Sequence, residues 1–197
     1  MNTGEYNIKI IKANIPVWVS KFPNHINIKD SIILSLDNFN SSEVTIPDVG
    51  HSISKTDWML SPLVVRDYFK IVESYWKEYL SIVYNTLGYA KYTIDNFWFQ
   101  QYCKGDNHPW HGHSGTNLSS VYYVELPDKL IETEFIDPYT RKIIKYQVSE
   151  GDVITFPAMM IHRSPTNSTS FRKTVIIVNS SGTEISTLLD DVYINTN

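Results

Sequence analysis

The stretch Asn107-His108-Pro109-Trp110-His111-Gly112-His113 holds three of the six histidines of this 197-residue chain. His111 and His113 are separated by one residue, and the stretch is expected to form a β-strand. Side chains at positions i and i+2 of a strand point to the same face, so both imidazoles would be presented to one point. This spacing predicts a metal site; the alternative is a solvated, histidine-rich loop without chemical consequence.

A second block supports the metal prediction. Residues 151–157 have the pattern of a strand that leads to His162, and Arg172-Lys173-Thr174 begins ten residues after that histidine. A jelly roll can hold a metal among neighbouring strands, with coordination positions left open for substrate and oxygen. We therefore expect His162 to join His111 and His113 around one ion.

Length and composition favour a single domain over residues 1–197. Thirteen tyrosines, eight phenylalanines and five tryptophans favour strand-rich, half-buried surfaces over a helical bundle. Within this domain we expect supporting strands and a helix over 1–91, a jelly-roll core over 92–180 and a C-terminal tail over 181–197.

The charge pattern and the cysteine content limit the partners and the compartment. The net charge of −4 is small, and without a basic stripe or polybasic cluster we expect neither nucleic acid nor a membrane surface as a partner. No apolar run is as long as a bilayer span, and the first residues lack the pattern of a secretory signal. The single cysteine, Cys103, fits a reducing compartment. We expect a cytoplasmic protein and leave its oligomeric state open.

The periodicity predicts one long amphipathic helix with strand-like stretches on both sides of it. Apolar residues recur at helical spacing over 63–87, and Gly88 is expected to cap the helix in a left-handed conformation. Short strands rich in β-branched residues are expected before the helix at 6–11, 15–19 and 31–36. The strands expected after it are 92–102, 110–113, 118–126, 129–135, 143–148, 152–156 and 172–179. This pattern predicts a mainly β fold, a jelly roll of the double-stranded β-helix type, supported by the helix.

Arg172 is the charged residue that most needs a partner. On a strand over 172–179, Arg172 and Thr174 share one face, and the guanidinium points into the barrel if that face is interior. A buried arginine without a partner is costly, and the strand offers it no carboxylate. We therefore expect a ligand anion to pair with Arg172, with a second hydrogen bond from Thr174. In the alternative, Arg172 faces solvent and Lys173 points inward; we favour the first arrangement because Lys173 would otherwise share a buried face with apolar residues.

In the order and spacing of four segments, the chain resembles the 2-oxoglutarate- and Fe(II)-dependent oxygenases. The similarity is to the branch near the prolyl hydroxylases that includes small phage and marine bacterial members, and it covers about residues 92–180. The segments are Phe99–Gly105 leading to His111, Leu118–Val124 followed by Pro127, Gly151–Pro157 leading to His162, and Arg172–Thr174.

The resemblance implies Fe(II) as the metal, 2-oxoglutarate as cosubstrate and O2 as co-reactant, with His111 as the first metal ligand and His162 as the distal one. The implied reaction releases succinate and CO2 and hydroxylates a peptide or protein side chain or a small molecule. Halogenation is a minor alternative if His113 does not bind the metal.

The same resemblance assigns the cosubstrate site. Arg172 and Thr174 would hold the C5 carboxylate of 2-oxoglutarate, assisted by a tyrosine hydroxyl from Tyr123 or Tyr102. We favour Tyr123 because it occupies the second position of the Tyr-Tyr pair of the family. The oxygenase interpretation depends on an inward guanidinium, that of Arg172, which faces the metal across a length that a five-carbon diacid can bridge.

The chain departs from the family at His113, which stands where an aspartate or glutamate is usual. His113 is either the third metal ligand, or stands aside, or becomes the first ligand in a shifted register. We favour three histidines, because bound 2-oxoglutarate is a dianion and would neutralise the charge that the missing carboxylate leaves on Fe(II). Metal affinity is therefore expected to depend on the cosubstrate.

The substrate is poorly constrained by the sequence. Trp98, Gln100, His108 and Trp110 are candidates for the mouth of the site, although core and rim packing explains them equally well. Two other functions remain open: a three-histidine, cupin-type dioxygenase that uses no 2-oxoglutarate, and a jelly-roll binding or structural protein. An arginine and threonine pair after the distal histidine favours the oxygenase, because the other functions have no need of it.

Overall fold

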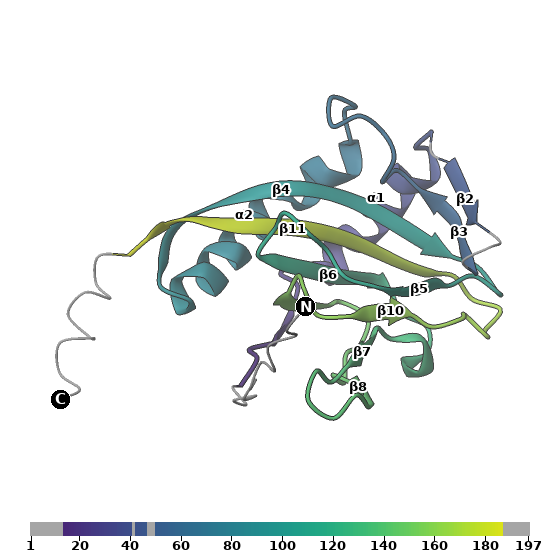
Figure 1. Cartoon of the computed structure of the whole chain (residues 1–197). Coiled ribbons are helices and arrows are strands. Elements are labelled where there is room, and N and C mark those ends of the chain that lie inside the picture. The colour runs from purple at the N-terminus through teal and green to yellow at the C-terminus, as the bar shows by residue number, and fades with distance from the viewer. Residues whose placement is uncertain (1–13, 41, 47–49, 187–197) are drawn as a thin grey trace, which may run out of the picture.

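The computed structural model describes residues 14–40, 42–46 and 50–186, which form two antiparallel sheets and two α-helices (Figure 1). The larger sheet has the strand order β1 (Trp18–Lys21), β9 (Asp152–Pro157), β6 (Leu118–Glu125), β11 (Lys173–Ile185), β4 (Tyr89–Tyr102), β3 (His51–Thr56) and β2 (Ser42–Ile46). The smaller sheet has the order β5 (His108–His111), β10 (His162–Ser164), β7 (Glu134–Ile136) and β8 (Ile143–Lys145). A short 3₁₀ helix, η2 (Lys129–Ile131), precedes β7.

The mainly β architecture is as predicted, but the predicted strand over 31–36 is an α-helix, and the predicted strand over 129–135 begins as the 3₁₀ helix η2. Residues 31–36 lie in α1 (His25–Asp37), whose buried residues are Ile28, Ile32 and Leu36. These three recur every four residues, which places them on one face of a helix, and that face packs in the core. The expected strand over 6–11 lies outside the described residues.

The helix predicted over 63–87 corresponds to α2 (Asp67–Thr86). It begins later because residues 57–66 form a loop that Arg66 holds in place, as described below. Its buried side chains lie against the larger sheet, and Gly88 follows the helix in the predicted left-handed conformation, with φ of 80°.

The larger sheet separates two hydrophobic cores. One lies between the sheet and the two helices and includes Ile176 and Val178 of β11. The other lies between the two sheets and includes Val175 and Ile177 of the same strand. Alternate residues of β11 therefore face opposite cores, and both faces of the strand are buried.

The register of β4, β11 and β6 arranges the side chains that face the smaller sheet into rows. The rows are Asn96–Asn179–Ser119, then Trp98–Ile177–Val121, then Gln100–Val175–Tyr123, and finally Tyr102 beside Lys173. Polar residues lie at one end, apolar residues in the middle, and a lysine at the other end. None of the described helices is long and apolar enough to span a membrane.

Candidate metal and cosubstrate site

Three histidines converge between the two sheets. His111 and His162 lie directly opposite each other on the paired strands β5 and β10, and their ring centroids are 4.2 Å apart. His113 follows two residues after His111, and its backbone amide donates to the carbonyl of Ala158 at 2.8 Å. One ligand nitrogen from each of the three rings lies within 4.8 Å of the others. The predicted three-histidine cluster is therefore assembled, and its separations are within reach of a single ion.

A hydrogen bond at Nδ1 fixes the orientation of each ring. His111 Nδ1 lies 2.8 Å from the carbonyl of Pro109, and His162 Nδ1 lies 2.8 Å from the carbonyl of Met160. His113 Nδ1 lies 2.9 Å from Oδ1 of Asn179. Because a carbonyl oxygen only accepts, each Nδ1 carries the proton, and the lone pair of each neutral ring is at Nε2. This second shell is typical of histidines that bind a metal through Nε2.

Burial lowers the pKa values of His162 and His113. Desolvation, together with the neighbouring His111, lowers the pKa of His162 to about 3. Desolvation also lowers the pKa of His113, against the hydrogen bond to Asn179, which raises it. A neutral ring is the form that binds a metal ion, so the cluster is prepared for a cation at neutral pH.

The histidines line a small interior chamber of about 30 Å³, and Lys173 reaches the same chamber from β11. Its side chain is only 1% exposed, and its Nζ donates to the carbonyl of Ile131 at 2.7 Å and to Oγ of Ser164 at 2.9 Å. The ammonium also lies over the rings of Tyr102 and Tyr123, at 5.3 and 5.8 Å from their centroids. An ammonium has three donors, so one remains available to a ligand in the chamber. Burial lowers the pKa of Lys173 to about 7.

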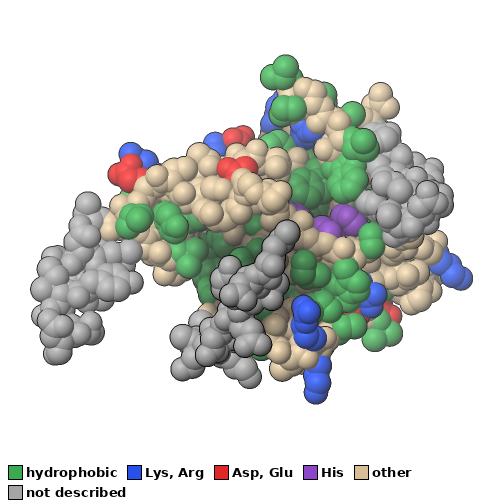
Figure 2. All heavy atoms as spheres, in the orientation of Figure 1, with side chains coloured by type: hydrophobic (Ala, Val, Ile, Leu, Met, Phe, Trp, Pro, Cys, Tyr) green, Lys and Arg blue, Asp and Glu red, His purple; other side chains and the backbone are tan. Residues whose placement is uncertain are grey.

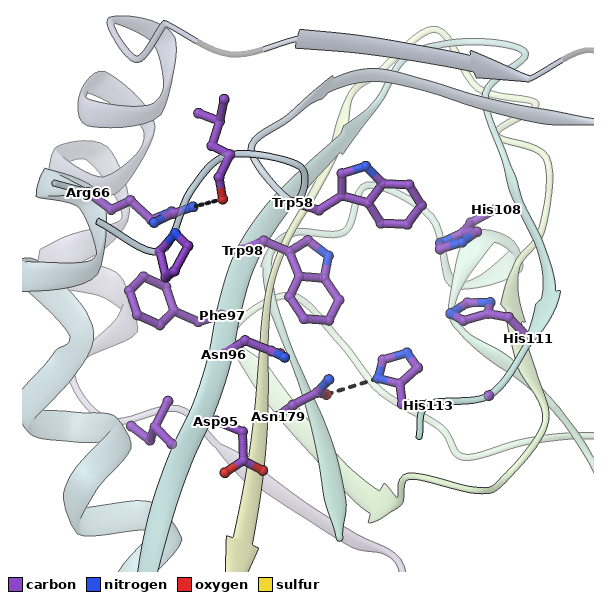
Figure 3. Close-up of a pocket in the computed structure, with 14 residues that line it drawn as sticks. Trp58, Arg66, Asp95, Asn96, Phe97, Trp98, His108, His111, His113 and Asn179 are labelled. Atoms are coloured by element: carbon purple, nitrogen blue, oxygen red, sulfur yellow. Dashed lines mark hydrogen bonds between the residues drawn. The ribbon is translucent and has the colours of Figure 1, made fainter. Parts of the chain in front are cut away.

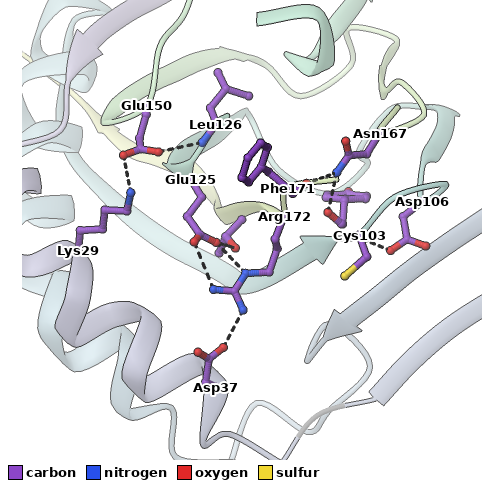
Figure 4. A network of polar contacts seen from close by, with 12 residues as sticks. Lys29, Asp37, Cys103, Asp106, Glu125, Leu126, Glu150, Asn167, Phe171 and Arg172 are labelled. Atoms are coloured by element: carbon purple, nitrogen blue, oxygen red, sulfur yellow. Dashed lines mark hydrogen bonds and ion pairs between the residues drawn. The ribbon is translucent and has the colours of Figure 1, made fainter. Parts of the chain in front are cut away.

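The prediction that Arg172 points into the barrel is wrong. Its Nε donates to Glu125 at 2.8 Å, and its Nη1 donates to Asp37 at 2.8 Å, on the outer side of the sheet (Figure 4). The two partners come from β6 and from the end of α1, so the sequence of the strand could not reveal them. Arg172 is held by two carboxylates and does not line the chamber, whereas the neighbouring Lys173 does.

The expected orientation of Thr174 is wrong for the same reason, because it shares the face of Arg172 and its hydroxyl donates to Glu125. The two tyrosines differ in position. Tyr102 lines the chamber, and its hydroxyl donates to Oε1 of Gln100 at 2.6 Å. The hydroxyl of Tyr123 donates to Thr133 at 2.8 Å, so Tyr123 contributes its ring beside Lys173.

The strand β10 connects the histidines to the lysine, so its residue spacing indicates roughly how far apart they are. His162 and Ser164 lie two residues apart on it, which is about 6.6 Å along a strand. Ser164 contacts the ammonium of Lys173, whereas His162 belongs to the cluster. A five-carbon diacid extends over a similar length, about 5 Å between its terminal carbons.

A wider cavity of about 580 Å³ opens on the other side of the histidines (Figure 3). Trp98 and His108 line both this cavity and the chamber, and the ring of His108 stacks on His111 with a centroid distance of 3.9 Å. Gln100 lines only the chamber, where its Nε2 lies 3.4 Å from Nδ1 of His108. Trp110 lines neither space, because its ring packs against the guanidinium of Arg163 at 4.4 Å. In Figure 2 the histidine side chains lie in a hollow bordered by hydrophobic side chains.

One wall of the wide cavity is a loop for which the sequence pattern predicted no role at the site. Residues 57–66 supply Trp58, Leu60 and Pro62 to the lining. Asp57 is fully buried and accepts hydrogen bonds from Nε of Arg66 at 2.5 Å and from the hydroxyl of Tyr68 at 2.7 Å. The other donors of Arg66 bond four backbone carbonyls of the loop, those of Asp57, Leu60, Ser61 and Val64. In the sequence, the only sign of this ion pair is an aspartate and an arginine nine residues apart. That spacing does not indicate that the two side chains are buried or in contact.

No family model matches the sequence, and no curated protein matches it either. Solved structures do match. A 2OG-Fe(II) oxygenase family oxidoreductase from Burkholderia pseudomallei is 14% identical, with a TM-score of 0.62 and 80% of each chain covered. The chain has the fold of the 2-oxoglutarate- and Fe(II)-dependent oxygenases. The jelly-roll architecture therefore agrees with the prediction.

Two further structures with the oxygenase fold are similar. A prolyl hydroxylase from Trichoplax adhaerens, in complex with a hypoxia inducible factor peptide fragment, is 11% identical, with a TM-score of 0.63; the match covers 92% of this chain and 87% of the other. The non-heme alpha ketoglutarate dependent epimerase SnoN from nogalamycin biosynthesis is 10% identical, with a TM-score of 0.64 and coverages of 85% and 78%. Proteins with this fold thus include one with a peptide bound and one from a biosynthesis of small molecules.

Proposed function

We propose that this protein is a 2-oxoglutarate- and Fe(II)-dependent oxygenase that hydroxylates a peptide or protein side chain or a small molecule. The observation that carries the proposal is a single buried chamber with three histidines at one end, each hydrogen-bonded through Nδ1 to a carbonyl oxygen, and Lys173 at the other. The fold agrees with this function, and the spacing of His162 and Ser164 along β10, about 6.6 Å, is close to the length of a five-carbon diacid.

The donor set fits a divalent metal ion. His111, His113 and His162 would hold it through Nε2, since each Nδ1 is occupied by an acceptor. Imidazole suits Fe(II), and the positions that three protein ligands leave open would take the cosubstrate and oxygen. With three neutral ligands, the positive charge of the ion would be compensated by the dianion of 2-oxoglutarate.

Lys173 would bind the C5 carboxylate of 2-oxoglutarate. Its ammonium is desolvated, is fixed by Ile131 and Ser164, and has one donor left. In a buried site such a charge-assisted hydrogen bond is stronger than one between neutral groups. Ser119 Oγ and Trp98 Nε1, which line the same chamber, are buried and have no hydrogen-bond partner in the described part of the chain, so they are available to a polar ligand.

When bound, Fe(II) and 2-oxoglutarate would activate O2, which is the oxidant: 2-oxoglutarate supplies two of the four electrons that O2 takes up, and the substrate supplies the other two. In the balanced reaction, O2 gives one oxygen atom to the substrate C–H bond, which becomes C–OH, and the other to succinate, while carbon 1 of 2-oxoglutarate leaves as CO2. The residues of the chain orient the diacid between Lys173 and the histidines and exclude water by apolar side chains such as Phe135 and Phe156. Substrate would enter by the cavity beside Trp58 and Trp98.

Lys173 is also the feature that distinguishes the proposed function from the alternative functions. A three-histidine dioxygenase without 2-oxoglutarate, or a binding protein that holds zinc, has no need of a desolvated cation at one diacid length from the metal. Lys173 thus favours the oxygenase over the other functions, as Arg172 was predicted to do.

Release of succinate tests the proposal without knowledge of the substrate. The protein is incubated with Fe(II), 2-oxoglutarate and air, and succinate is measured over time. We expect slow uncoupled turnover that is lost in His162→Ala and Lys173→Met and retained in Arg172→Gln, the control at the neighbouring position. Turnover that is equal in the wild type and in Lys173→Met would refute the cosubstrate site, and the absence of any 2-oxoglutarate binding or turnover would refute the function.

A further inference from the structure

Strand β4 has a free edge beside the wide cavity. It extends over Tyr89–Tyr102, but β3 pairs with it only at Gln100 and Gln101. Along Tyr89–Trp98 no described strand lies on that side of β4, whereas β11 pairs with its other side along the strand (Figure 1). Further along β4, the strand position that β3 fills is therefore taken by none of the described strands.

The backbone at this edge offers hydrogen bonds. The N–H and C=O of Phe99 point to the edge, because they bond Oδ1 of Asp57 at 2.9 Å and Oγ1 of Thr56 at 2.7 Å. In an antiparallel strand, residues two apart direct these groups to the same side. Phe97 therefore presents its N–H and C=O at the same edge, and no hydrogen bond to either is found in the described part of the chain.

Two cavities border the edge. The cavity of about 580 Å³ beside the histidines continues, through the shared residues Ile94 and Phe97, into a second cavity of about 710 Å³ beside α2. Phe69 of α2 stacks on Phe97 in the second cavity, whereas Trp98 faces the histidines. A strand added at this edge would alternate its side chains between the two cavities.

The cations along this groove are already paired, and Asp95, a carboxylate that lines the wide cavity, accepts hydrogen bonds from the hydroxyls of Thr93, Thr116 and Ser181. Lys77 contacts Glu73 at 2.6 Å, and Lys91 contacts Glu184 at 2.6 Å. All five donors of Arg66 are used, as described above. Among the described residues the groove therefore has no free cation for an anionic segment, and its apolar lining, which includes Trp58, Leu60 and Phe69, favours uncharged side chains.

We propose that the substrate is an extended peptide segment with uncharged side chains, which binds as an added strand along the free edge of β4, in line with β3. This inference rests on the proposed oxygenase function. Main-chain hydrogen bonds to Phe97 and its neighbours supply the affinity, and the two cavities take alternate side chains. The residue beside Trp98 enters the cavity at the histidines, and its side chain is the one hydroxylated.

Peptides with matched backbone modifications test this inference. A pool of capped synthetic decapeptides with uncharged, randomised positions is screened against the protein loaded with Mn(II) and 2-oxoglutarate under argon, and the tightest binder is labelled for fluorescence anisotropy. Two isomers of it are then made, N-methylated at alternate residues, one at the odd positions and one at the even. An added strand uses the N–H groups of only one set, so we expect one isomer to retain its affinity and the other to bind about tenfold more weakly or worse.

Protein variants locate the binding surface. Ala90→Trp fills the exposed end of the groove and should weaken binding of the peptide about tenfold, since a bulky side chain displaces the added strand. Ser20→Trp places the same side chain on β1, at the other end of the sheet, and should leave binding unchanged.

Three results would overturn the inference: equal binding of both isomers, no effect of Ala90→Trp, or no peptide binding by protein that does bind 2-oxoglutarate. Self-association that Ala90→Trp abolishes, seen by analytical ultracentrifugation, would assign the edge to a second copy of the chain and overturn it too. A failure of 2-oxoglutarate itself to bind would instead refute the proposed function, so the two failures are distinguishable.

Discussion

The ammonium of Lys173 lies 2.9 Å from the hydroxyl of Ser164, which stands on β10 two residues after His162. This contact joins the two ends of the chamber through one short strand, so the distance between cation and histidines is set by backbone geometry. A rigid spacing of this kind selects a ligand by its length.

Replacement of Lys173 should therefore remove the binding of 2-oxoglutarate. Lys173→Met keeps the length of the side chain without its charge, and loss of a buried charged partner weakens ligand binding by about 100-fold or more. Isothermal titration of the Mn(II)-loaded protein with 2-oxoglutarate under argon measures this. Arg172→Gln is the matched control and should change the affinity less than about threefold, because Arg172 bonds Glu125 and Asp37 outside the chamber. A large effect of Arg172→Gln together with none of Lys173→Met would reverse the assignment.

The binding of 2-oxoglutarate should also depend on pH through Lys173. Burial lowers its pKa to about 7, so the free protein carries the charged form below pH 7 and loses it above. A carboxylate pairs with the charged form, and binding above pH 7 must take up a proton. We expect the affinity to fall by up to about tenfold per pH unit above 7. Titrations at pH 6.5 to 9, in buffers of different ionisation enthalpy, report the proton uptake, and its persistence in Lys173→Met would assign it to another group.

The same lysine shows where the sequence was sufficient and where it was not. The i and i+2 spacing of His111 and His113 and the strand before His162 correctly predicted which histidines meet, because both signals are local. Arg172 was predicted to point into the barrel because the alternative would put Lys173 on a buried face with apolar residues. Both faces of β11 are buried, one against the helices and one against the smaller sheet, so apolar alternation could not show which face lines the chamber.

Tertiary contacts explain the other differences. The partners of Arg172 come from α1 and β6, which lie 135 and 47 residues away in sequence. The segment 31–36 is apolar enough for a strand. It forms a helix because its packing against α2 and the sheet buries residues that are four apart. The ion pair of Asp57 and Arg66 produces no periodic pattern in the sequence.

Metal binding should be coupled to the cosubstrate. Three neutral imidazoles leave the charge of the ion uncompensated, and bound 2-oxoglutarate neutralises it, so each ligand should raise the affinity for the other by the same factor, about tenfold or more. Titration of Mn(II) with and without saturating 2-oxoglutarate measures the factor. His113→Asp adds the missing carboxylate and should strengthen Mn(II) binding without 2-oxoglutarate while reducing the coupling. Identical Mn(II) affinities with and without 2-oxoglutarate in the wild type would contradict the charge argument.

Asn179 should hold His113 in the orientation that binds the metal. Its Oδ1 lies 2.9 Å from Nδ1 of His113, and loss of such a second-shell acceptor lowers metal affinity by about 10- to 100-fold. Asn179→Ala tests this by Mn(II) titration. Asn96→Ala is the control, because Asn96 is the neighbour of Asn179 in the same row but is exposed. Equal losses in the two variants would indicate a general effect on the sheet.

The ion pair of Asp57 and Arg66 should stabilise the wall of the substrate cavity. Arg66→Met leaves a fully buried carboxylate without its cation, which costs about 3–5 kcal/mol. For a chain of this length the melting temperature should fall by about 10 °C. Lys70→Met breaks the exposed pair of Lys70 with Asp67 and should change stability by less than about 1 kcal/mol. Thermal unfolding followed by circular dichroism measures both, and equal shifts would show that burial of the pair is not what matters.

Because Arg66 also orders residues 57–66, Arg66→Met should weaken substrate binding at temperatures where the protein is still folded, with 2-oxoglutarate binding at Lys173 retained.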